Sequence, residues 1–84
     1  MPISHLQVSL FLRYDGDPDG LARHGSAEEQ GLMAGGAWDE IEQLRLELAN
    51  LKAGQRSPAA RQRALTRAAA ALEEPAFALL WRHA

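Results

Sequence analysis

The chain has 84 residues, of which 46% are hydrophobic and 24% are charged, a composition typical of one small globular domain. The absence of cysteine excludes disulfide bonds, thiol catalysis and thiolate metal sites, and the formal net charge of −2 argues against a general nucleic-acid binder. No apolar run approaches the roughly 20 residues that cross a bilayer, and the first residues lack the basic region of a signal peptide. We therefore expect no membrane association and a cytoplasmic location, in the protein's own cell or in a host cell.

Residues 3–14 show a regular alternation of apolar and polar side chains. The apolar positions fall on every second residue: Leu6, Val8, Leu10, Leu12 and Tyr14. This period of two predicts a half-buried β-strand, with Phe11 and Arg13 on its outward face. A lone strand leaves backbone polar groups unpaired. We therefore expect it to pair across a homodimer, with a partner protein, or with a strand that the sequence does not reveal.

Residues 15–25 form an Asp- and Gly-rich segment that predicts a loop. Asp15, Asp17 and Asp19, followed by Gly20, resemble the first half of an EF-hand calcium loop, which implies a weak calcium site. Position 12 of such a loop would be Ser26, where an EF-hand has a bidentate Glu. An exposed turn is therefore the preferred interpretation, and we expect no metal and no other cofactor.

Four helices are predicted after this loop. Residues 26–34 begin with Ser-x-x-Glu, the pattern of a capping box. Residues 37–53 carry an apolar stripe with the spacing of one helix face, formed by Ile41, Leu44, Leu48 and Leu51. Ser57 and Pro58 start a helix over 57–74, and Pro75 separates it from a short helix over 76–83.

The apolar residues are mainly of types that favour helices. The chain has 16 Ala and 13 Leu, whereas Val, Ile and Thr together number only four. With the N-terminal strand included, the predicted fold is a mostly helical α+β domain, and all 84 residues form one unit.

Basic residues concentrate in the last third of the chain. Residues 55–84 hold five basic and two acidic side chains, whereas residues 1–54 hold four basic and nine acidic ones. Arg56, Arg63 and Arg67 fall on one helix face and predict a site for an anionic partner. The alternative is internal, since Glu40 and Glu47 can pair with these arginines if the two long helices form a hairpin.

No set of side chains points to catalysis or to a phosphate-binding loop, so we expect a protein that is not an enzyme. The predicted function is a protein–protein interaction module, acting as an inhibitor, adaptor or antitoxin-like regulator of the kind found in phages and mobile elements. The candidate partner-binding residues are Arg56, Arg63, Arg67, Phe11, Arg13, Trp38 and Leu46. The alternative is a dimeric nucleic-acid-binding regulator that uses the arginine face.

Overall fold

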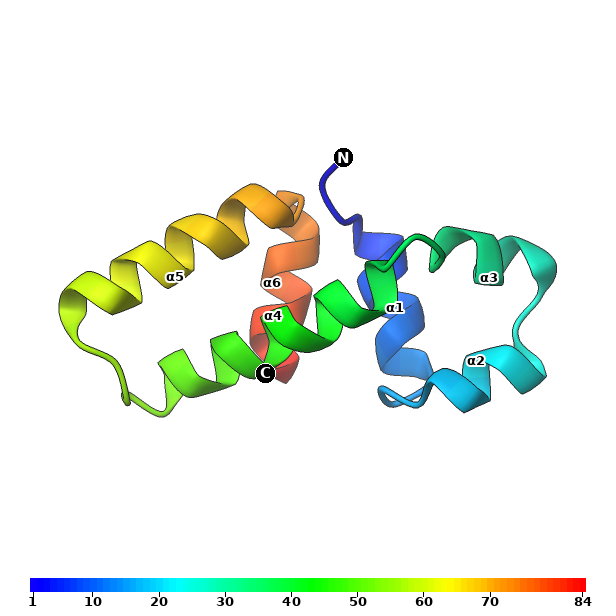
Figure 1. The fold of residues 1–84 in the computed structure, drawn as a ribbon, viewed down its shortest axis with the longest axis horizontal. Helices are drawn as coiled ribbons and strands as arrows, with labels where there is room; N and C mark the ends of the chain where they lie inside the picture. Colours follow the sequence, from blue (N-terminus) through cyan, green and yellow to red (C-terminus); the bar gives the residue numbers. More distant parts are fainter.

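The computed structural model describes all 84 residues, and its regular elements are all helices (Figure 1). In chain order they are α1 (His5–Arg13), α2 (Pro18–His24), α3 (Ala27–Leu32), α4 (Ala37–Lys52), α5 (Pro58–Ala71) and α6 (Glu74–His83). The molecule is elongated, with extents of 42 × 23 × 18 Å. Helices α1 and α6 lie in the middle, the tip of the α4–α5 hairpin forms one end, and α2 and α3 form the other (Figure 1).

The predicted N-terminal strand is wrong, because residues 5–13 fold as α1. A capping box starts this helix: the Ser4 hydroxyl accepts a hydrogen bond from the Gln7 backbone N–H at 3.2 Å, and the Gln7 side chain accepts one from the Ser4 N–H at 2.9 Å. Ser-x-x-Gln is a recognised form of that motif. The α+β fold class is therefore corrected to an all-helical one.

The alternation of apolar and polar residues predicted the wrong structure because α1 is covered on more than one side. It packs mainly against α6 and also against α4. Val8, Leu10 and Phe11 are all buried, although they do not share one narrow helix face. The exposed residues His5, Leu6 and Arg13 share one side of α1, so the helical period is present, but most apolar residues also fall on alternate positions along the chain and so fit a strand as well. Phe11, predicted on the outward face, is only 1% exposed.

One isolated bridge between extended residues remains, between Ile3 and Leu72. The Ile3 N–H donates to the Ala71 carbonyl at 2.9 Å, and the Glu73 N–H donates to the Ile3 carbonyl at 2.8 Å. These bonds attach the N-terminus to the corner between α5 and α6. No unpaired strand edge is left for a second copy or a partner to extend.

The predicted loop over residues 15–25 is also corrected, since most of it forms α2. The Asp17 side chain accepts a hydrogen bond from the Asp19 N–H at 3.0 Å, and Pro18 occupies the first turn of the helix. An Asp cap followed by Pro is a helix start signal. The Ser26–Glu29 capping box is present at the start of α3.

The end of α5 differs from the prediction. The helix stops at Ala71, and Leu72 and Glu73 are extended before α6 starts. Pro75 lies in the first turn of α6, where its missing N–H has no helical partner to lose. Pro75 therefore belongs to the start of α6, and α5 is shorter than the segment 57–74.

The core consists of hydrophobic side chains only, and no polar or charged residue is buried. Its centre is the stripe of α4, which packs against α1, α5 and α6. Helix α5 contributes only Ala64 and Ala68 to the buried set, and α3 contributes none. The buried residues are Ile3, Val8, Leu10, Phe11, Leu21, Met33, Trp38, Ile41, Leu44, Leu48, Leu51, Ala64, Ala68, Leu72, Ala76 and Leu80.

Candidate binding surface

The clearest surface feature is the segment 48–72, here called the basic hairpin, which contains basic but no acidic residues. It comprises the end of α4, the connection and α5, and its tip forms one end of the molecule (Figure 1). Its basic side chains are all exposed: Lys52, Arg56, Arg61, Arg63 and Arg67. The structure thus gathers the three predicted arginines on one projecting unit.

Arg67 is engaged within the chain. Its Nη1 atom lies 3.0 Å from Glu47 Oε1 on the neighbouring helix, so the internal pairing is confirmed for these two residues. Glu40, the other acid considered, makes no ion pair. Exposed pairs of this kind stabilise a fold by about 0.2–1 kcal/mol. Arg67 therefore helps to hold α5 against α4 and is partly neutralised.

Two further cations of the basic hairpin bind helix C-termini. Arg61 donates from Nη1 to the Leu51 carbonyl at 2.8 Å, at the end of α4. Lys52 donates from Nζ to the Trp81 carbonyl at 2.8 Å and stands 5.3 Å from the centre of the Trp81 ring. Cations at these positions satisfy terminal carbonyls and favour the negative end of the helix dipole. Both therefore have a structural role.

Arg56 and Arg63 differ from the other three cations. Neither forms an ion pair or a side-chain hydrogen bond with the rest of the protein. A guanidinium presents several donors in a planar fork that matches a carboxylate or a phosphate. These two arginines are therefore the cations of the basic hairpin that are free to bind an anionic partner.

Phe11 and Trp38, two of the predicted partner-binding residues, lie in the core. Their ring centres are 4.8 Å apart, with 49° between the ring planes, and Arg45 covers the Phe11 ring at 5.9 Å. Trp38 is 8% exposed, and its Nε1 atom is buried without a hydrogen-bond partner. Neither ring is available to a partner in this conformation, because the helical α1 turns Phe11 inward against α4.

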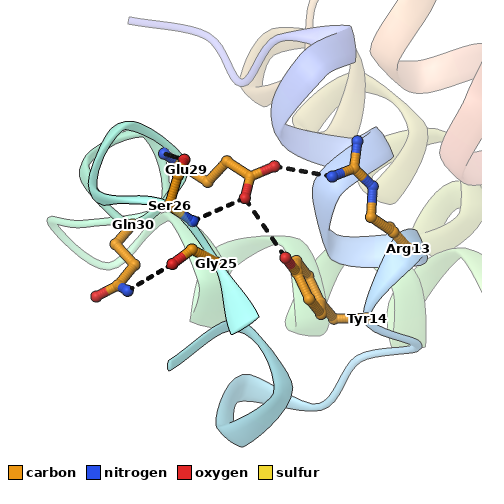
Figure 2. A network of polar contacts seen from close by, with 6 residues as sticks. All are labelled: Arg13, Tyr14, Gly25, Ser26, Glu29 and Gln30. Carbon is orange, nitrogen blue, oxygen red and sulfur yellow. Dashed lines mark hydrogen bonds and ion pairs between the residues drawn. The ribbon is translucent and has the colours of Figure 1, made fainter. Parts of the chain in front are cut away.

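Arg13, also a predicted binding residue, belongs to a polar network that connects α1 with α3 (Figure 2). Its Nη1 atom lies 2.8 Å from Glu29 Oε2. The other carboxylate oxygen of Glu29 accepts from the Ser26 N–H at 2.9 Å and from the Tyr14 hydroxyl at 3.4 Å. Gln30 Nε2 adds a bond to the Gly25 carbonyl at 3.1 Å.

The same contacts change the acidity of Glu29. Its pKa is held below the ordinary glutamate value chiefly by the hydrogen bond from the Ser26 backbone. Desolvation opposes this effect, and the charge and hydrogen bond of Arg13, with the hydrogen bond of Tyr14, lower the pKa further. The ionised carboxylate is therefore the form that fits the network. This network accounts for Arg13 and Glu29 as groups that attach α3 to the end of α1.

Of the apolar residues predicted to bind a partner, only Leu46 lies on the surface. It is 65% exposed, on the side of α4 that faces away from the buried stripe. It is an isolated apolar side chain, and single exposed leucines are common on soluble domains.

The three aspartates of the predicted calcium loop do not converge on a common point. Asp17 caps α2, and Asp15 has a positive φ of 52° in the turn that precedes it. The structure contains no group of three or more His, Asp or Glu side chains placed to hold a metal ion. In this fold these residues form a helix-capping turn.

Two hollows are present on the surface. The smaller, of about 210 Å³, is lined by Ala69, Leu72, Glu74 and Phe77 where α5 meets α6. The larger, of about 380 Å³, lies between the N-terminal residues and the start of α4. Ser4 supplies the one hydroxyl in these linings, and it is already occupied by the cap of α1.

Among the helices there is none with the length and apolar character that a bilayer crossing demands. Comparison of the chain with protein-family models, with curated proteins and with solved structures gave no match.

Proposed function

We propose that this chain is a non-enzymatic, cytoplasmic interaction module that binds an acidic surface of a larger protein through the basic hairpin, and so inhibits, recruits or regulates that protein. The observation that carries the proposal is the state of Arg56 and Arg63. Both are exposed, and no acidic residue lies in the whole segment 48–72 that contains them.

The placement of the charges supports a protein partner. Arg63 and Arg67 lie one helical turn apart on α5, where like charges repel by a few tenths of a kcal/mol, about 0.2–0.5. A carboxylate from a partner offsets this repulsion and forms bidentate hydrogen bonds. Arginine is also among the residue types that contribute most to protein interfaces.

One observation favours a second candidate function, nucleic-acid binding. The long polar side chains exposed along α5 are hydrogen-bond donors, and none is a carboxylate: Arg61, Gln62, Arg63, Thr66 and Arg67. Arg, Gln and Thr contact phosphates and base edges. The net charge of −2 opposes this function, because it weakens the long-range attraction of the whole protein to a phosphate backbone.

The two functions can be separated by fluorescence anisotropy with two labelled probes, a polyglutamate peptide and a duplex DNA. We expect the peptide to bind, and the double variant Arg56→Glu/Arg63→Glu to bind it at least about tenfold more weakly. The matched control is Arg23→Glu, which makes the same kind of charge change on α2, at the opposite end of the molecule. This control should stay within about twofold of the parent chain, since α2 and the tip of the hairpin lie at opposite ends of a molecule 42 Å long and exposed charges are screened over a Debye length of about 10 Å at 0.1 M salt.

The double variant changes the net charge by −4 and Arg23→Glu changes it by −2. A loss of binding free energy in Arg23→Glu that reaches half of the loss in the double variant would overturn the proposal, because binding would then follow net charge alone. Tighter binding of DNA than of the peptide, with an affinity that falls steeply with salt, would replace it with the second candidate function. Circular dichroism of each variant verifies that the helices are intact.

A further inference from the structure

Helix α6 has an outer side that no other part of the chain covers completely. Glu74, Phe77, Ala78 and Trp81 have the spacing i, i+3, i+4 and i+7, so they share one side of the helix, here called the α6 strip. The buried residues Ala76 and Leu80 point to another side, into the core. The strip is therefore a second apolar surface on a helix that already packs against α1, α4 and α5.

The middle of the α6 strip is aromatic, and its two rings are partly buried against the core. The Phe77 and Trp81 rings are stacked, with centres 6.3 Å apart and 11° between their planes. The hollow of about 210 Å³ lies beside Phe77 and extends the apolar surface onto Ala69 of α5 and onto Leu72, which follows that helix. Ala78 lies between Phe77 and Trp81 in the sequence and is exposed. Its small side chain allows another helix to approach closely.

The two ends of the α6 strip carry opposite charges. Glu74 is exposed at the start of the helix and lines the hollow. Lys52 lies over Trp81 near the end of the helix, with its Nζ atom 5.3 Å from the ring centre. A surface with an acid at one end, a cation at the other and an apolar centre is complementary to its own copy turned by 180°.

We propose that the α6 strip is the interface of a homodimer in which α6 pairs antiparallel with α6 of a second copy. A two-fold axis between Phe77 and Ala78 sets residue 74 of one copy opposite residue 81 of the other. Glu74 then faces Lys52 of the second copy, twice in each dimer. Burial of the aromatic rings supplies the apolar contribution, which a chain of this size needs because its own core is small.

This inference does not rest on the two arginines that carry the proposed function, since Arg56 and Arg63 lie outside the α6 strip, although Lys52 belongs to the basic hairpin as well. A dimer presents two basic hairpins to a partner.

A single-cysteine crosslink tests the geometry, and the chain is suited to it because it contains no cysteine. Ala78→Cys places one cysteine of each copy next to the proposed axis. A disulfide requires a separation of about 4.4–6.8 Å between the two Cα atoms, which residues beside the axis of closely packed helices can reach. We expect mild oxidation to convert this variant to a covalent dimer. The control, Ala22→Cys, places an exposed thiol on α2, away from the α6 strip, and should remain uncrosslinked. Equal crosslinking of the two variants would overturn the proposed pairing.

A charge exchange tests the same interface in solution by light scattering over a range of concentrations. The parent chain should show twice its mass of 9.2 kDa, and Glu74→Lys or Lys52→Glu should weaken the dimer about tenfold by opposing like charges. The double variant should restore it to within about twofold. Because each single change also affects the ends of α6, rescue by the pair is the decisive result. A mass of 9.2 kDa at all concentrations, or a double variant weaker than either single one, would contradict the proposal.

Discussion

At the scale of single residues, one carboxylate joins two parts of the fold that share little apolar contact. Glu29 receives hydrogen bonds or charge from Ser26, Arg13 and Tyr14, although α3 itself buries no side chain. This polar network therefore helps to position α3, together with Leu32, which is partly buried against the core at the end of the helix. Since hydrogen bonds to an ionised group are stronger than neutral ones, the attachment should depend on pH.

The lowered pKa of Glu29 predicts the sign of that dependence. Its stabilising effect is complete above the pKa of an unfolded-state glutamate and is lost as the pH falls through the lower pKa of the folded state. Glu29→Gln should therefore lower the free energy of unfolding at pH 7 by more than it does at pH 3, as measured with urea. The control is Glu28→Gln, an exposed neighbour, whose effect should change little between the two pH values. A pH-independent cost of Glu29→Gln would show that only the shape of the side chain matters.

At the scale of elements, the helix starts depend on short local motifs. Ser4, Asp17, Ser26 and Ser57 each accept a backbone hydrogen bond at an N-cap, and only α4 and α6 begin without one. The caps satisfy N–H groups that have no partner inside the helix. They therefore define where the helices of this chain begin, even where the apolar pattern is ambiguous.

The cap of α1 offers a test of the helical N-terminus. Ser4→Ala should reduce stability by about 1 kcal/mol, within the range of about 0.5–2 kcal/mol for the loss of an N-cap. Ser9→Ala, inside the same helix, should be neutral or slightly stabilising, because alanine favours helix interiors. Urea unfolding followed by circular dichroism measures both. If the two substitutions have the same effect, the capping box does not contribute to the stability of α1.

At the scale of the whole molecule, the packing is uneven along the long axis. The centre, where α1, α4 and α6 meet, holds the fully buried side chains such as Phe11, Leu48 and Leu80. The first turns of α5, residues 58–63, contain no buried side chain, and neither does α3. Segments with little buried apolar surface open locally at lower free energy than the core does.

Hydrogen exchange should therefore follow this gradient. Amides of α3 and of residues 58–63 should exchange well before those of α6 and the middle of α4, when measured by mass spectrometry of proteolytic fragments. Within α5, protection should increase toward Ala64 and Ala68, the two buried positions. Uniform protection along α5 would mean that another surface covers it in solution.

Much of this architecture could be predicted from the sequence. The apolar stripe of α4 faces the protein core, as its spacing predicts; it consists of Ile41, Leu44, Leu48 and Leu51. The predicted caps Ser26 and Ser57 start α3 and α5. The Arg67–Glu47 pair follows from two helices joined by a short connection. These features are local or involve neighbouring elements, so their physical causes lie within a few turns of chain.

The sequence by itself determined the capped starts of α3 and α5, the apolar stripe of α4 and the concentration of basic residues in the last third of the chain, because each depends on residues close together in the chain. Only the tertiary structure decided that residues 5–13 are helical, since their apolar pattern fits both a half-buried strand and a helix that packs against α6 and α4. It also decided which side chains remain free. Burial of Phe11 and Trp38, and the exposure of Arg56 and Arg63 without partners, depend on which helices meet, and sequence spacing does not contain that information.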